Sequence, residues 1–177
     1  HDGESYFGLG DKPGSLNLKG KRYENWVTDS YAYGRDSDPI YKAIPFYTGL
    51  HHGKAYGIFF DNTYKTEYNF GIDSEDNYSF STPGGEVIYY FIYGPTYKQM
   101  IGRYTQLTGK PIMPPAWALG FSQCRGLLTN EALTCEIAAG FRERKIPCDI
   151  IYQDIGWTQY LQNFEWRHEN YNDPVKM

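Results

Sequence analysis

The spacing of hydrophobic and polar positions changes near the middle of the chain. Up to about Gly94, short runs rich in Tyr, Phe, Ile, Val and Thr alternate with turn sequences such as "HHGK", "DSEDN" and "TPGGE". This alternation is typical of β-strands joined by hairpins. We therefore predict an antiparallel β-sandwich for residues 1–95, with the polar stretch "DSYAYGRDSDP" as a loop.

A helical period follows the predicted sandwich. Apolar side chains recur at helical spacing, at Tyr97, Ile101, Tyr104 and Leu107. Gly109 is a suitable end for this helix, and the Pro-rich string "KPIMPP" after it cannot continue one. We assign residues 96–116 to a helix and connector and place the domain boundary there.

Residues 117–177 begin with a strand–helix–strand pattern. The apolar runs Trp117–Cys124 and Cys148–Ile155 have the length of strands, and Thr129 or Asn130 can cap a helix between them. The helix shows one apolar face, with Leu133, Ile137 and Phe141 at four-residue intervals. Two strands joined by a helix predict a parallel pair with a right-handed crossover.

One aspartate stands at each end of the second predicted strand. In parallel α/β folds, ligands bind at the carboxyl ends of the strands. Asp149 lies at the amino end of this strand and Asp154 at its carboxyl end. We therefore take Asp154 as the functional candidate and Asp149 as a structural residue. A helix cap or a buried ion pair is the alternative role for Asp154.

Composition and charge indicate which classes of ligand or partner suit this chain. Aromatic residues make up 18 % of the 177 residues, which suits either a strand-rich fold or surfaces that bind sugars. A net charge of −4 without a basic cluster argues against a nucleic-acid partner. No apolar run approaches the ~20 residues of a membrane span.

The sequence offers little for a metal site, a disulfide framework or a targeting signal. The 3 Cys residues include no CxxC pair. His51 and His52 are adjacent, which suits an exposed turn better than metal chelation. The first residues do not match a signal peptide, so the sequence assigns no compartment.

Several phrases in one order resemble glycoside hydrolase family 31, the α-glucosidase and α-xylosidase family. They are "YFGLGDKPGSLNLKGKRYENWVTDSYAYG", "DPIYKAIPFY", "YGIFFDNTYKT", "YYFIYGPTYKQMIGRYTQLTGKPIMPPAWALGF" and "GFRERKIPCDIIYQDIGW". The resemblance covers nearly the whole chain. It implies a β-sandwich followed by the first βαβ unit of a (β/α)8 TIM barrel in residues 117–177. Because such a barrel needs roughly 250 residues, we expect this chain to be a fragment of a larger enzyme.

The resemblance also implies a reaction. It indicates a retaining α-glycosidase that hydrolyses terminal α-glucosidic bonds of oligosaccharides, with α-xylosidase or α-transglucosylase activity as alternatives. Two carboxyl groups perform this chemistry without a cofactor. The family's nucleophile phrase, W-x-D-x-x-E, is absent from the sequence. We therefore assign no catalytic residue and expect the isolated chain to be inactive. A non-catalytic carbohydrate-binding or structural module is the remaining alternative.

The resemblance places part of a sugar pocket in this chain. Asp154 corresponds to the family's aspartate that accepts hydrogen bonds from hydroxyls of the terminal sugar, and Ile155 to a position that shapes substrate choice. Asp29 corresponds to an aspartate on a sandwich loop that reaches the pocket; its alternative role is a turn residue bonding its own backbone. Arg125 and Trp157 complete the expected set.

Two departures from the family pattern fall beside these residues. Gly126 follows Cys124–Arg125, where many relatives have an aromatic residue, and its small size would open space near the sugar. Gly156–Trp157 stands where many α-glucosidases have Asp-Tyr. Trp157 either stacks on a pyranose face or packs against the barrel.

Overall fold

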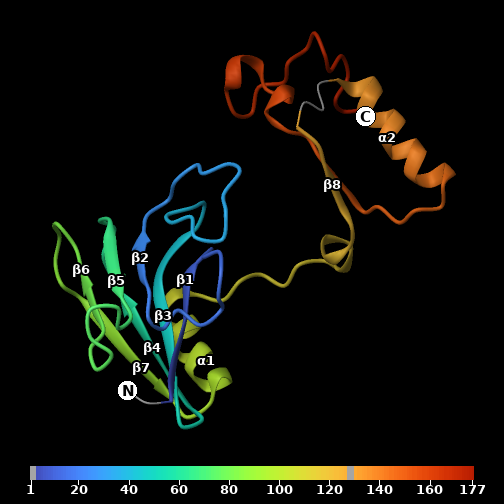
Figure 1. Cartoon of the computed structure of the whole chain (residues 1–177). Helices are drawn as coiled ribbons and strands as arrows, with labels where there is room; N and C mark the ends of the chain where they lie inside the picture. The colour runs from blue at the N-terminus through green and yellow to red at the C-terminus, as the bar shows by residue number, and fades with distance from the viewer. Residues whose placement is uncertain (1–2, 127–129) are drawn as a thin grey trace. The chain divides into compact units, whose positions relative to one another are not determined.

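The chain forms two compact units, His1–Lys110 and Pro111–Met177 (Figure 1). The computed structural model describes residues 3–126 and 130–177. Within these residues, no helix has both the length and the apolar character needed to cross a bilayer.

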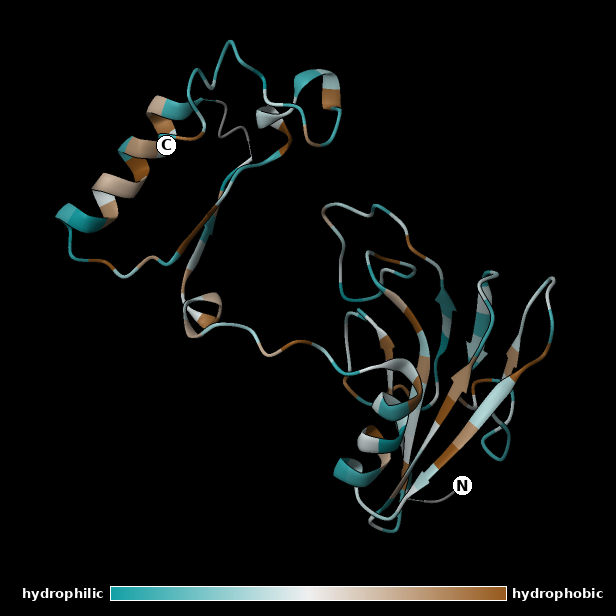
Figure 2. Cartoon of the chain, turned by 180° about the vertical axis from the view of Figure 1, so that it is seen from behind, coloured by the Kyte–Doolittle hydropathy of each residue, from teal (hydrophilic) through white to brown (hydrophobic). Residues whose placement is uncertain are grey.

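The strands of the first unit form two antiparallel sheets, as the alternating pattern predicted. The larger sheet has the order β1-β3-β4-β7 and consists of β1 (Glu4–Gly10), β3 (Ala43–His51), β4 (Lys54–Phe60) and β7 (Tyr89–Gly94). The smaller has the order β2-β5-β6 and consists of β2 (Arg22–Asn25), β5 (Thr66–Asn69) and β6 (Ser79–Ser81). Figure 2 shows hydrophobic residues along these strands.

An aromatic core joins the two sheets. Its buried members are Tyr6, Leu9, Leu18, Tyr23, Tyr47, Ile58, Tyr68 and Phe70. The Tyr47 ring on β3 meets the Tyr68 ring on β5 edge to face, with centroids 5.8 Å apart. Since β3 and β5 belong to different sheets, this contact packs one sheet on the other, as in a sandwich.

Helix α1 (Tyr97–Thr108) covers the other face of the larger sheet. Met100 is fully buried with Phe46, Ala55 and Ile92, and the Tyr104 ring stacks on Phe46 at 3.8 Å. Our prediction grouped this helix with the connector of residues 96–116. The structure instead places α1 within the first unit, because its apolar face is buried against β4 and β7.

The predicted hairpins have different outcomes. "HHGK" closes the β3–β4 hairpin, and the positive φ angles of His52 (48°) and Gly53 (75°) match a type I′ turn. "DSEDN" joins the paired strands β5 and β6. The hairpin prediction for "TPGGE" is wrong, because this segment connects β6 to β7 in the other sheet. The Asn62 amide holds it by donating to the carbonyls of Gly84 and Glu86.

The second unit contains the predicted strand–helix–strand pattern. β8 (Ser122–Cys124) pairs in parallel with β9 (Ile150–Tyr152), and α2 (Glu131–Glu143) lies between them in sequence. Both strands are shorter than predicted. The 3-10 helix η1 (Ala116–Leu119) takes up the start of the first run, and η2 (Ile155–Trp157) begins at the end of the second. A third 3-10 turn, η3 (Gln159–Leu161), follows.

The start of α2 has the predicted capping chemistry. Asn130 Oδ1 accepts a hydrogen bond from the amide of Leu133 at 2.8 Å. Thr129, the alternative cap, lies outside the described residues. The place of this β8–α2–β9 unit in a closed barrel remains a prediction.

Candidate functional site

The carboxyl ends of β8 and β9 lie at the same edge of their small sheet. Cys124 pairs with Tyr152 in the parallel register. The next residues on both strands are therefore neighbours. A Cβ atom added to Gly126 would lie 3.5 Å from Oδ2 of Asp154. Parallel pairing thus brings Asp154 beside the glycine that departs from the family pattern.

Asp154 caps the 3-10 helix that follows it. Its Oδ1 accepts a hydrogen bond from the amide of Ile155 at 2.7 Å, and its carbonyl oxygen accepts one from the amide of Trp157 at 3.1 Å. The cap that we considered as an alternative role is therefore present. Within the described residues, Oδ2 has neither a hydrogen-bond donor nor an ion-pair partner, so it remains free to accept hydrogen bonds from a ligand.

The residue before Asp154 is fixed by a small polar network. Gln153 receives a hydrogen bond from the buried Tyr171 hydroxyl at 2.8 Å and donates one to Thr134 Oγ1 at 3.0 Å. Thr134 in turn donates to the carbonyl of Asn130 at 3.0 Å. This network ties the end of β9 to the first turn of α2. Sequence reasoning missed it, because its members lie far apart in the chain and share no periodic pattern.

Trp157 packs within the second unit. Its ring centroid lies 4.9 Å from that of Trp166, and the Trp166 centroid lies 5.3 Å from that of Tyr171. The amide of Arg167 also donates to the Trp157 carbonyl at 2.8 Å. This is packing against the segment after β9. Stacking of Trp157 on a pyranose remains a prediction.

Ile155 and Arg125 are exposed. A depression of about 510 Å³ opens beside Ile155 and is lined largely by residues 155–161. Asp154, Arg125 and Trp157 are not among its lining residues. Five residues were predicted to bind sugar, and four of them follow the two strand ends closely in sequence. The structure does not gather those four around one closed cavity.

Asp29 lies in the first unit, on the connection between β2 and β3. Its carboxylate interacts with the hydroxyl of Tyr41. Desolvation, and then this carboxylate, raise the pKa of the Tyr41 phenol. Tyr33 meets Tyr41 edge to face at 6.1 Å. Asp29 and Asp154 belong to separate units, so a shared pocket remains a prediction.

Titratable side chains do not form an evident metal site in the part of the chain that the structure describes. No group of three His, Cys, Asp or Glu side chains is placed to hold an ion there. Cys148 is buried, whereas Cys124 and Cys135 are exposed.

Both units match domains of one enzyme family. Residues 1–69 match the N-terminal galactose mutarotase-like domain of glycosyl hydrolase 31, and residues 111–177 match the TIM-barrel domain of glycosyl hydrolases family 31.

The chain is also similar to proteins named for glycosidase activities. An α-glucosidase 2 of Bacillus thermoamyloliquefaciens is 43 % identical over 92 % of this chain, and an α-xylosidase of Lactiplantibacillus pentosus is 34 % identical over 97 %. A family 31 dextranase of Flavobacterium johnsoniae, solved with isomaltotriose, is 58 % identical over 99 % of the chain, with a TM-score of 0.91. The chain spans 21 %, 22 % and 21 % of these proteins, or about a fifth of their length.

Proposed function

This chain belongs to glycoside hydrolase family 31, and from that premise we propose that the protein containing it is a retaining α-glycosidase. It hydrolyses terminal α-glucosidic bonds of oligosaccharides. The observation that supports this proposal is the Asp154 carboxylate at the end of β9, whose Oδ2 lies beside Gly126 and has no hydrogen-bond partner among residues 3–126 and 130–177. Among the activities named for its relatives are those of α-glucosidases, an α-xylosidase and a dextranase.

Asp154 is proposed to bind the terminal sugar. A carboxylate accepts hydrogen bonds from two neighbouring sugar hydroxyls, and each charge-assisted bond contributes about 1.5–3 kcal/mol. The Ile155 amide already occupies Oδ1 and fixes the plane of the carboxylate. Oδ2 then presents a preset acceptor, which reduces the entropy lost on binding. Ile155, Trp157, Arg125 and Asp29 are also proposed to bind the substrate.

No residue of this chain is proposed as a nucleophile or as an acid/base. A retaining glycosidase needs two carboxyl groups roughly 5–5.5 Å apart on either side of the scissile bond. The family's nucleophile phrase does not occur in these 177 residues. We infer that both groups belong to other parts of the protein, and that the 177-residue chain alone does not hydrolyse glycosides.

The substrate is less sharply defined than the reaction. The relative that is 58 % identical is a dextranase solved with isomaltotriose, which favours α-linked glucose oligomers of that kind as substrates. The xylosidase match and the small residue at Gly126 keep α-xylosides as an alternative. Transfer of glucose to a second sugar is a further alternative, because a retaining enzyme passes through a glycosyl-enzyme intermediate.

The experiment is an assay of the complete protein on maltose, isomaltotriose, dextran and an aryl α-xyloside. Products are separated by chromatography, so that transfer products are counted beside free glucose. Release of glucose with retained anomeric configuration supports the proposal. If none of these substrates is cleaved or transferred, the proposed function is wrong.

A non-catalytic sugar-binding role has one observation in its favour. A depression of about 360 Å³ on the first unit is flanked by two half-exposed aromatic rings, Trp26 and Tyr64. A Cβ atom added to Gly84 would lie 2.8 Å from the Tyr64 ring, so the ring lies directly against this glycine backbone. Exposed aromatic faces of this kind stack on sugars. Saturable binding of isomaltotriose by the chain in calorimetry, lost in Trp26→Ala, with no turnover by the complete protein, would favour this role.

A further inference from the structure

The connection from β2 to β3, residues 26–42, carries Asp29 and is called the Asp29 loop. Its base is closed by a hydrogen bond from the amide of Thr28 to the carbonyl of Ile40, at 3.1 Å. Ile40 is only 3 % exposed and anchors the returning half of the loop. Asp29 follows Thr28 directly, so its position depends on how this base is held.

A buried lysine fastens the loop to the sandwich. The Lys12 side chain is only 3 % exposed, and it forms an ion pair with Asp38 of the loop. Its Nζ also donates to the Glu24 carbonyl on β2 at 2.6 Å. The second carboxylate oxygen of Asp38 accepts a hydrogen bond from the Glu24 amide. Lys12 therefore ties β2 and the loop to the chain segment that follows β1.

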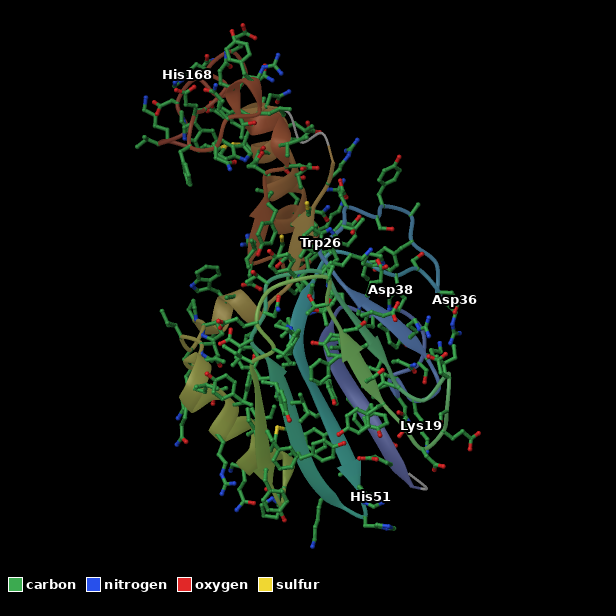
Figure 3. The ribbon with its side chains drawn as sticks, turned by 90° about the vertical axis from the view of Figure 1, so that its left-hand side faces the viewer. Lys19, Trp26, Asp36, Asp38, His51 and His168 are labelled. Atoms are coloured by element: carbon green, nitrogen blue, oxygen red, sulfur yellow. The ribbon has the colours of Figure 1, made fainter. Side chains whose placement is uncertain are left out.

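Because the Lys12–Asp38 ion pair is largely buried, removing either charge would leave the other without a counter-charge. The Asp38 side chain is 16 % exposed, and Lys12 Nζ lies 5.5 Å above the Tyr23 ring. Desolvation, then the charges of Asp38 and Asp36, raise the pKa of Tyr23. Figure 3 shows Asp36 and Asp38 on the loop, at the opposite end of the first unit's strands from His51. Without Lys12, the Asp38 carboxylate would keep one hydrogen bond but lose its counter-charge, which favours moving this part of the loop into water.

We propose that Lys12 is a positioning residue for Asp29. By pairing with Asp38 it holds the Asp29 loop in the conformation in which the Asp29 carboxylate meets the substrate. This inference rests on the proposed function, in which Asp29 contacts the sugar. Lys12 itself is buried and does not contact the substrate. This role could not be recognised from the sequence, because Lys12 and Asp38 are 26 residues apart.

The test uses the complete protein and three variants, Lys12→Met, Asp29→Ala and the two combined. Lys12→Met keeps an unbranched side chain, one atom shorter than that of lysine, and removes its charge. We expect each single variant to raise KM about tenfold with kcat nearly unchanged, because each removes binding shared by ground and transition states. We expect the double variant to match Asp29→Ala, since Lys12 acts through Asp29.

Tyr56→Phe is the matched control. It removes a buried hydrogen bond of the same unit, from the Tyr56 hydroxyl to Glu4 at 2.6 Å, and it leaves the Asp29 loop untouched. A merely destabilising effect would appear in this control as well, whereas we expect its KM to stay at the wild-type value. In the 177-residue chain, hydrogen exchange of the Thr28 amide is expected to quicken in Lys12→Met relative to the amide of Tyr47, and not in Tyr56→Phe.

The outcomes separate the two proposals. A wild-type protein without glycosidase activity overturns the proposed function, and the inference with it. If Asp29→Ala leaves KM unchanged, Lys12 has nothing to position and the inference is wrong while the activity stands. If Asp29→Ala raises KM but Lys12→Met does not, or if the two effects simply multiply, the positioning role is also wrong. Should Lys12→Met fail to fold, Lys12→Met with Asp38→Asn removes both charges together and is expected to show the same rise in KM.

Discussion

Asp154 and Gly126 lie against each other at the carboxyl ends of two parallel strands, with Oδ2 of Asp154 at 3.5 Å from where a Gly126 Cβ would be. The two residues are 28 positions apart in the sequence, and only the β8–β9 register brings them together. Since 3.5 Å is ordinary van der Waals contact, a Cβ atom at position 126 would fit beside this oxygen without a clash. Because Oδ1 caps η2 and Oδ2 is the oxygen proposed to bind the sugar, a substitution can test the two roles of Asp154 separately.

Asp154→Asn is expected to keep the fold and weaken substrate binding. The Asn Oδ1 still accepts the Ile155 amide, so the melting temperature should stay close to that of the wild type. The amide nitrogen then takes the place of Oδ2 and cannot accept hydrogen bonds from the sugar, so we expect KM of the complete protein to rise roughly tenfold or more. Steady-state kinetics and thermal unfolding measured together check both statements. An unchanged KM would leave Asp154 with the capping role alone.

Two substitutions of Gly126, to alanine and to tryptophan, test whether a sugar lies beside Asp154. The alanine methyl meets Asp154 at ordinary contact distance and should leave both stability and KM nearly unchanged. The tryptophan fills the space beside Oδ2, so kcat/KM for glucosides should fall about tenfold or more if a sugar occupies that space. The comparison is made in the complete protein with one glucoside and one xyloside. Equal kcat/KM for alanine and tryptophan variants would place the sugar elsewhere.

Gly94→Ala is expected to loosen α1 from the larger sheet. A Cβ atom there would lie 2.4 Å from the Met100 amide nitrogen and 2.7 Å from its Cα, so the helix backbone must shift. Overpacking of this kind destabilises by about 1–3 kcal/mol. Gly102→Ala is the control, because nothing lies within 4 Å of its added Cβ. It should stabilise the same helix by about 0.5–1 kcal/mol. Urea unfolding of the chain measures both, and equal effects of the same sign would contradict the packing.

Alkaline pH is expected to unfold the first unit through its buried tyrosines. Burial, and then hydrogen bonds to Glu4, raise the pKa of Tyr6 and Tyr56, while burial alone raises that of Tyr68. A phenol whose pKa is higher in the folded than in the unfolded chain stabilises the fold below about pH 10, the ordinary value. That stabilisation is lost as the pH rises above it, since the unfolded chain then ionises first.

This alkaline unfolding can be followed by measuring phenolate absorbance as a function of pH, together with near-ultraviolet circular dichroism. We expect part of the phenolate absorbance to appear only at the pH at which tertiary structure is lost. Tyr68→Phe is the control variant, because the Tyr68 hydroxyl is buried without a hydrogen-bond partner in the described residues. It should reduce this late signal by one tyrosine at little cost in stability. Ionisation of all tyrosines while the dichroism stays native would contradict the prediction.

Most strands and both helices could be predicted from short stretches of sequence. Short runs rich in aromatic and β-branched residues, separated by turn sequences, indicated the strands of the first unit, and apolar residues at helical spacing indicated both helices. Asn130, one of the two predicted caps, does cap α2, and it was recognisable because capping depends on neighbours within one turn. The turn at "HHGK" was recognisable for the same reason. A β-turn involves only four residues, and Gly53 readily adopts the positive φ angle that this turn needs. The hairpin prediction for "TPGGE" was wrong because turn residues indicate where the chain reverses, but do not indicate which sheet the next strand joins.

The sandwich, the strand–helix–strand pattern, the family resemblance and the aspartate after β9 could all be recognised in the amino-acid sequence. They could be recognised because periodicity, capping and family phrases are properties of short stretches of chain. Three contacts became evident only in the folded chain: Asp154 beside Gly126, Gln153 held by Thr134 and Tyr171, and Lys12 paired with Asp38. These contacts join residues that are far apart in the chain, and their free energy comes from burial and pairing, which no single segment encodes.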